Sequence, residues 1–267
     1  MTTSSGHLDF NRGSLVYQVN GSGAPIAFLH GFALDMAMWV AQFRHFGRKH
    51  CAVRYDLRGF GRSSLPSATY DHCDDLFALL DRLALKRPLL VGLSLGANVA
   101  LRFAAEHPGR VAGIVLASPG LPGHIWSEER PPDAARAVGK ARGVEAARTF
   151  WGSHAIFASL ATYPSARAEV MRMLAGYSGW HWREDDLQAP AAPIIERLET
   201  ISTPALVMSG GRDVAGYRDI AQVLASRLPN ARLVQYPDCG HMLTMEQPDA
   251  VNAEIAAFAA QVLKPVP

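Results

Sequence analysis

One serine of this chain lies between two glycines directly after an apolar run. Ser94 is the centre of the pentapeptide GLSLG, flanked by Gly92 and Gly96, within the stretch LLVGLSLGANVALRFAAEHP. A tight turn from a buried strand into a helix leaves no room for side chains two positions from its centre, which explains both glycines. Such a turn lifts the serine hydroxyl clear of the sheet, beside the free N–H groups that begin the helix. The pentapeptide alone fits a simple turn equally well, so it is the strand-to-helix context that predicts a nucleophile.

A serine hydroxyl is a poor nucleophile at neutral pH and needs a base, which in turn needs an orienting acid. Asp213 ends the apolar run ALVMSGGRD, and His241 follows ARLVQYPDCG. Both are expected at strand exits, where open α/β sheets place their active sites, and they follow the serine in the order acid, then histidine. Taken singly, each residue also fits a loop or turn role. Asp219, Asp238 and Glu246 are competing acids, and Asp213 is preferred for its place at the strand end.

Acyl transfer also needs donors for the developing oxyanion. One is expected from the backbone N–H of Leu95, the residue after the serine, and the second from the backbone N–H of Phe32 in the loop FLHGFALD. A single donor of this kind is typically worth about 2.7–4 kcal/mol of barrier. His30 in the same loop lies before the other chemistry-bearing residues and has no partner acid in sequence, so we interpret it as a histidine that fixes the loop.

The elements that must position these residues alternate along the chain. Short apolar runs (PIAFLHG, CAVRYDL, PLLVGLS, AGIVLASPG) alternate with helical periodicity up to about residue 120, and the same rhythm resumes from residue 201. This pattern predicts an α/β fold with a mostly parallel central sheet flanked by helices. Residues 121–200 show helical, Ala- and Arg-rich stretches without a strand-like run. We therefore expect a core of residues 1–120 and 201–267, with a helical cap, 121–200, inserted after the sixth strand.

The predicted cap holds four of the five tryptophans. Trp126, Trp151 and Trp180 are candidates for flat apolar walls of a substrate pocket, although the same rings could simply pack the cap helices together. No tight cluster of basic residues marks a carboxylate clamp. A diacid lactone therefore has no support beyond single arginines such as Arg130 or Arg183.

The composition narrows the function classes. The formal net charge is +2 and the basic residues are scattered, which argues against a nucleic-acid or anionic-membrane partner. No run approaches the roughly 18 apolar residues of a membrane span, and the first residues do not read as a signal segment. Three scattered cysteines favour neither a disulfide framework nor a zinc site. The sequence thus predicts a cytoplasmic protein without cofactor or metal, acting on a small molecule, and leaves a homo-oligomer open.

Several motifs together carry a family resemblance. HGF, YDLRGFGRS, GLSLG, GGRD and DCGH occur in the order and approximate spacing of the α/β-hydrolases, over nearly the whole chain. The sequence most resembles small capped bacterial hydrolases related to 3-oxoadipate enol-lactonases and aryl esterases. The resemblance implies that Ser94 is the nucleophile, Asp213 the orienting acid and His241 the general base. It also implies structural roles for Asp56 and Arg58. The helix LGANVAL departs slightly from relatives that carry a further glycine there.

The function expected from these residues is hydrolysis of a small carboxylic ester or lactone through an acyl-enzyme. A serine in place of an aspartate nucleophile argues against epoxide opening and halide displacement. Hydrolysis of C–C bonds in ring-cleavage products, and cofactor-free perhydrolase or haloperoxidase activity, remain alternatives because they use the same residues. A slow-turnover ligand sensor is the alternative from another class.

Overall fold

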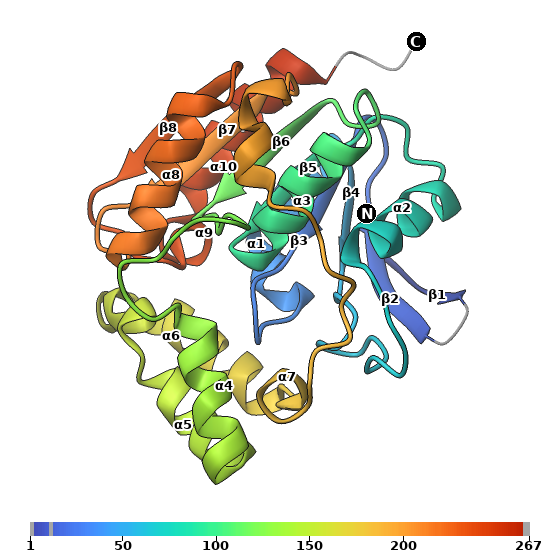
Figure 1. The fold of residues 1–267 in the computed structure, drawn as a ribbon. Coiled ribbons are helices and arrows are strands. Elements are labelled where there is room, and N and C mark those ends of the chain that lie inside the picture. The colour runs from blue at the N-terminus through green and yellow to red at the C-terminus, as the bar shows by residue number, and fades with distance from the viewer. Residues whose placement is uncertain (1–2, 11–12, 264–267) are drawn as a thin grey trace.

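The computed structural model describes residues 3–10 and 13–263, and an eight-stranded sheet forms its centre (Figure 1). The strand order is β1-β2-β4-β3-β5-β6-β7-β8. The pairs β1–β2 and β2–β4 are antiparallel, and the others are parallel. The predicted mostly parallel sheet is therefore confirmed. The strands are β1 (Ser4–Phe10), β2 (Gly13–Asn20), β3 (Pro25–Leu29), β4 (Cys51–Tyr55), β5 (Leu89–Leu93), β6 (Gly113–Ala117), β7 (Ala205–Gly210) and β8 (Ala231–Tyr236).

The central strands are apolar on both sides, as parallel strands covered by helices must be. Every residue of β5, β6 and β7 is buried. In the sheet register Leu29 pairs with Gly92, and Gly92 pairs with Leu116, so neighbouring parallel strands end at one common edge. Residues that follow these strands are thereby brought together although they lie far apart in sequence.

Helices cover both faces of the sheet. Figure 1 shows α2, α3 and α8 on the near face and α1 and α10 behind it. Among the described residues, no helix is long and apolar enough to cross a membrane. The bounds are α1 (Val40–Phe46), α2 (His72–Arg82), α3 (Leu95–Glu106), α8 (Ala215–Arg227), α9 (Leu243–Glu246) and α10 (Pro248–Val262), with the 3-10 helix η1 (Met36–Trp39) before α1.

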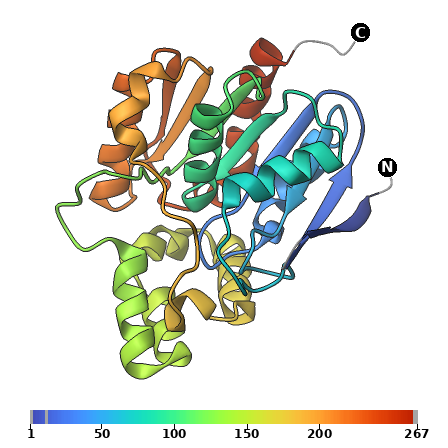
Figure 2. The same ribbon diagram turned by 45° about the vertical axis from the view of Figure 1, so that its right-hand side comes forward.

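A group of helices is inserted between β6 and β7, after the sixth strand as predicted. Figures 1 and 2 show α4–α7 gathered together at one end of the sheet. We call residues 121–200 the cap segment. Its packing centres on aromatic side chains, of which Trp151 and Trp182 are almost fully buried. The elements are α4 (Pro131–Arg142), α5 (Val144–Gly152), η2 (Ala155–Thr162), α6 (Pro164–Gly176), α7 (Trp180–Arg183) and η3 (Ile194–Thr200).

Candidate active site

Ser94 occupies a strained turn between β5 and α3. Its backbone has φ 53° and ψ −108°, a left-handed value that is costly for a residue with a side chain. The two glycines make this turn possible. A Cβ on Gly96 would lie 2.1 Å from the Leu29 carbonyl oxygen, and one on Gly92 would lie 2.3 Å from the Gly96 backbone. The strain and the close backbone approach are the features expected of a nucleophile turn.

The structure brings Asp213 and His241 together. Nδ1 of His241 lies 2.9 Å from Oδ2 of Asp213, and the two residues are only 3% and 5% exposed, respectively. The other carboxylate oxygen of Asp213 accepts a hydrogen bond from the Val214 N–H, at 2.8 Å. Asp213 follows β7 and His241 follows β8, so both reach the site from the common edge of the sheet. Because Nδ1 is taken by the carboxylate, Nε2 is the ring nitrogen left for a proton transfer.

The three carboxyls that competed with Asp213 for the role of orienting acid are either exposed or bonded to other groups. Asp219 is exposed on α8, and Asp238 forms a surface ion pair with Arg212. Glu246 is buried and accepts hydrogen bonds from the Gly240 N–H at 2.7 Å and from the Ser159 hydroxyl at 2.8 Å. Burial raises the pKa of this carboxyl, while the two donors oppose that shift. Glu246 therefore binds the backbone beside the histidine and not the imidazole itself.

Phe32 and Leu95, predicted to supply the backbone donors, both lie at the cavity beside Ser94. Leu95 is the first residue of α3, so its N–H has no acceptor within the helix. Phe32 lies in the loop after β3. Both residues line the cavity that Ser94 lines. The ring of Phe32 also packs edge-on against Trp151, with centroids 5.8 Å apart, and so joins this loop to the cap segment.

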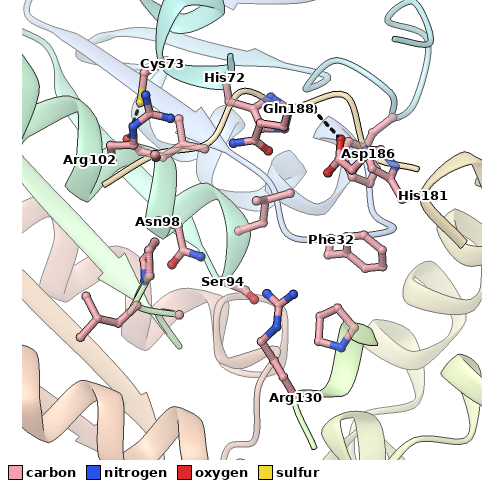
Figure 3. A pocket seen from close by; sticks show the side chains of 18 of the residues that line it. Phe32, His72, Cys73, Ser94, Asn98, Arg102, Arg130, His181, Asp186 and Gln188 are labelled. Atoms are coloured by element: carbon pink, nitrogen blue, oxygen red, sulfur yellow. Dashed lines mark hydrogen bonds between the residues drawn. The ribbon is translucent and has the colours of Figure 1, made fainter. Parts of the chain in front are cut away.

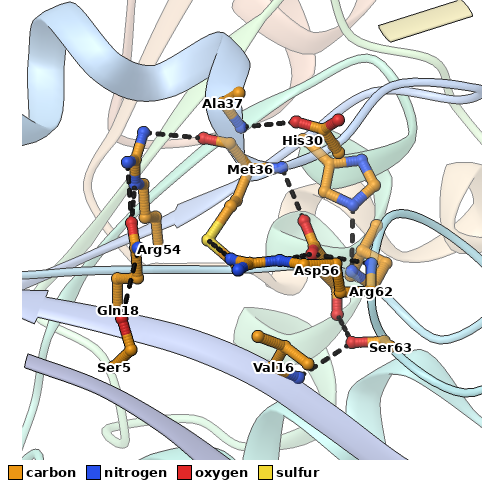
Figure 4. A network of polar contacts seen from close by, with 12 residues as sticks. Ser5, Val16, Gln18, His30, Met36, Ala37, Arg54, Asp56, Arg62 and Ser63 are labelled. Atoms are coloured by element: carbon orange, nitrogen blue, oxygen red, sulfur yellow. Dashed lines mark hydrogen bonds and ion pairs between the residues drawn. The ribbon is translucent and has the colours of Figure 1, made fainter. Parts of the chain in front are cut away.

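A buried polar network holds the Phe32 loop (Figure 4). Nε2 of His30 accepts from the Leu57 N–H at 2.9 Å, and Nδ1 donates to the Gly31 carbonyl at 2.8 Å. Burial lowers the pKa of His30, consistent with this neutral ring. Both ring nitrogens of His30 are thus bonded to the backbone, as expected of a histidine that fixes the loop. The Asp56 carboxylate holds the residues that follow, because it accepts a hydrogen bond from the Met36 N–H at 2.8 Å.

A cavity of about 350 Å³ opens beside Ser94 (Figure 3). Trp126 lines it, and Trp151 lines a smaller adjoining space together with Ser94 and His241. Trp180 lines neither space; its ring packs edge-on against His181, which does line the cavity. Within the described residues, no group of three or more His, Cys, Asp or Glu side chains could hold a metal ion.

Comparison with known proteins identifies the family of this chain. Residues 26–254 match the alpha/beta hydrolase family. The chain belongs to the α/β-hydrolase family. It is 29% identical over 263 residues to a putative carbamate hydrolase, RutD, of Caulobacter sp. (strain K31), covering 91% of this chain and 95% of that protein. The family resemblance predicted from the motifs is confirmed.

Solved structures of other α/β-hydrolases superimpose closely. A thermophilic esterase from Thermogutta terrifontis has a TM-score of 0.81 and 26% identity, covering 94% of this chain and 95% of that one. An enol-lactonase from Burkholderia xenovorans LB400 has a TM-score of 0.83 and 23% identity, covering 96% of this chain and all (100%) of that one. The second likeness is one of fold. This chain is thus an enzyme of the α/β-hydrolase family.

Tyr217 is a site residue that the sequence analysis missed. Its ring lies 4.3 Å from that of His241 and packs edge-on against Trp126 at 5.1 Å. Burial raises the pKa of the Tyr217 hydroxyl, and interaction with the Ser94 side chain opposes this shift. The phenol of this α/β-hydrolase is therefore protonated at neutral pH and faces the serine. The sequence feature that could have indicated Tyr217 is its place four residues after Asp213, in the first turn of the following helix.

The two arginines considered for a carboxylate lie in different places. Arg130 lines the cavity, but its guanidinium is bonded to Asp133 at 2.6 and 2.8 Å. Arg183 is exposed, pairs with Glu184 and does not line the cavity. The sequence analysis also did not predict several polar residues of the cavity, which come from α2, α3, α7 and the stretch between α7 and η3. They include His72, Asn98, Arg102, His181, Asp186 and Gln188.

Proposed function

We propose that this α/β-hydrolase cleaves a small carboxylic ester or lactone through a serine acyl-enzyme. The observation that carries the proposal is the buried 2.9 Å contact between His241 and Asp213 beside the space that Ser94 also lines. An imidazole oriented by a carboxylate, next to a strained serine, is the arrangement that activates a hydroxyl. The alignment of all three residues at strand exits gives the proposal its geometric basis.

The reaction follows from these positions. Ser94 Oγ attacks the acyl carbon while its proton passes to Nε2 of His241. Asp213 holds the ring in the tautomer that accepts this proton and stabilises the imidazolium that forms. The N–H groups of Phe32 and Leu95 stabilise the oxyanion. His241 then protonates the leaving alkoxide, and a water activated by the same ring releases the acid and regenerates the serine.

The cavity supports a small, largely uncharged substrate. Its volume of about 350 Å³ lies at the lower end of typical ligand sites. Trp126 and Trp151 supply apolar walls from the cap segment. The similarity to a solved esterase at 26% identity supports ester chemistry, and the similarity to a putative carbamate hydrolase supports attack on a carbonyl bonded to a heteroatom.

The test compares Ser94→Ala with Ser118→Ala. Ser118 is a matched control because it follows the neighbouring strand β6, is also buried and also has a positive φ. Initial rates are measured on short aryl esters, simple lactones and a ring-cleavage dienoate. We expect Ser94→Ala to lose about 10⁴- to 10⁶-fold in kcat with its fold retained by circular dichroism, because members of such a set act as a unit. Ser118→Ala should turn over normally.

Each other outcome points elsewhere. Wild-type turnover by Ser94→Ala would remove the serine mechanism. No turnover of the esters and lactones, together with turnover of the dienoate, would assign C–C bond hydrolysis to this enzyme. Product formation that stops near one equivalent of enzyme would assign the slow ligand sensor.

A further inference from the structure

The cavity has a polar end on the side away from Arg130. His72 begins α2 and Gln188 lies between α7 and η3, and both line this end of the cavity. Asn98, one turn into α3, lines the cavity next to Ser94, whose carbonyl accepts from the Asn98 N–H at 3.0 Å. Figure 3 shows His72 and Gln188 at one side of the pocket and Arg130 at the other. Nδ1 of His72 and Oδ1 of Asn98 are buried and have no hydrogen-bond partner among the described residues. A small number of placed polar side chains in an otherwise apolar pocket fixes how a ligand lies in it.

His72 is the best defined of these groups. It is 2% exposed, and burial lowers the pKa of its imidazole well below the ordinary value. The ring of Tyr70 packs edge-on against it, with centroids 5.1 Å apart. A neutral imidazole offers one donor and one acceptor. Together with the side-chain amide of Gln188, this end presents donors and acceptors but adds no charge.

The charged groups at this end of the cavity are already paired. Arg102 donates to both carboxylate oxygens of Asp71, at 2.6 and 3.0 Å, and to Glu106 at 2.7 Å. Asp186 accepts from the Tyr70 hydroxyl at 2.9 Å. An ionic ligand would have to compete with these internal partners. A neutral ligand group would meet no such competition.

The backbone holds this end in place. The Ala189 N–H donates to the Tyr70 carbonyl at 2.7 Å, and the Tyr70 N–H donates to the Leu187 carbonyl at 3.2 Å. These bonds join the end of the cap segment to the residues just before α2. His72 and Gln188 are thereby set on one wall although 116 residues separate them in the chain. Preorganised groups of this kind discriminate well between ligands that can and cannot satisfy them.

We propose that the substrate carries an uncharged hydrogen-bonding group, such as a carboxamide or hydroxyl, which His72 and Gln188 bind. This inference rests on the proposed function and names the substrate class of the same site: an ester or lactone with a neutral polar end. The carbonyl to be cleaved lies at Ser94, and the polar group occupies the opposite end of the cavity.

The test uses ester series that differ only at the chain end. The first series consists of 4-nitrophenyl esters of acids with four to eight carbons. At each chain length, the far end of the acid is a methyl, a carboxamide or a carboxylate group. A second series places the same ends on the alcohol of an acetate ester, so that either half of the substrate can reach the polar end. We expect kcat/KM of the wild type to favour the carboxamide over both other ends by about tenfold in one series.

Two variants assign the preference to named residues. Gln188→Leu and His72→Leu should each reduce the carboxamide-to-methyl ratio to about threefold or less. Gln188 lies outside helices and strands, so this variant keeps the test valid if His72→Leu does not fold. Gln235→Leu is the matched control, because that glutamine is exposed on β8 and does not line the cavity. Its ratio should equal that of the wild type.

Binding separates this inference from the proposed function. Dissociation constants of the same esters are measured calorimetrically on Ser94→Ala, which binds without turnover. A carboxamide preference in binding, with no hydrolysis by the wild type, would support the polar end and overturn the proposed reaction. Equal or tighter binding of the methyl or carboxylate ends in both series would overturn the inference, as would a carboxamide preference that both leucine variants leave unchanged.

Discussion

The two ends of the cavity satisfy their polar groups in opposite ways. At the Ser94 end, His241 and Asp213 bind each other, and the loops that carry them are held by further buried hydrogen bonds. At the far end, Nδ1 of His72 has no partner among the described residues. Groups fixed by the protein can be aligned for one reaction, whereas groups left unpaired select what binds. Changes at the first end should therefore act on kcat, and changes at the second on KM.

The largest effect expected at the Ser94 end after loss of the serine itself comes from Asp213→Asn. The amide cannot hold the imidazole of His241 in the required tautomer, so kcat should fall by about 10⁴-fold while KM changes little. The measurement is kcat and KM on the best ester of the panel, with circular dichroism to check the fold. A variant with more than a tenth of wild-type kcat would assign the acid to another residue.

Glu246→Gln is the matched comparison for Asp213→Asn. The glutamine oxygen can accept from the Gly240 N–H, and its amide nitrogen can donate to the Ser159 hydroxyl, so both partners of the carboxylate stay bonded. We expect kcat within about threefold of the wild type. A loss near that of Asp213→Asn would give Glu246 the orienting role instead.

The difference between the two ends also explains how far the sequence could predict the site. Ser94, Asp213 and His241 follow buried apolar runs, and parallel strands end at one edge, so a linear pattern was enough to expect them together. His72 and Gln188 share a wall only because the cap segment returns across the residues before α2. No periodicity or spacing reports such a long-range contact.

The fold shows the same division. The parallel strands β5, β6 and β7 were predicted from apolar runs that are buried on both faces. The edge strand β1 was not, because Ser4–Phe10 is half polar and becomes a strand only by pairing with β2. Tyr217 was missed for a related reason: its helix reads as an ordinary flanking helix, and only the packing turns that side chain toward Ser94.

Tyr217→Phe tests whether the Ser94 end includes this phenol. Loss of the hydroxyl, whose interaction with the Ser94 side chain opposes the rise of its pKa, should lower kcat by roughly three- to tenfold, with KM within twofold. Tyr236→Phe is the control, because that hydroxyl is buried, has no partner among the described residues and does not line the cavity. A change in KM alone would make Tyr217 a wall of the pocket and not a positioning residue for the nucleophile.

Arg130→Gln should have the smallest effect, although Arg130 lines the cavity at the end away from His72. The guanidinium lines the cavity but is half-exposed and already bonded to Asp133, so its charge is largely compensated and screened. We expect kcat/KM to change by less than about twofold for methyl-, carboxamide- and carboxylate-ended esters alike. A selective tenfold loss for the carboxylate ester would mean that Arg130 leaves Asp133 to bind the substrate. The cavity would then select an anion beside Ser94, and the neutral far end would no longer be what distinguishes one substrate from another.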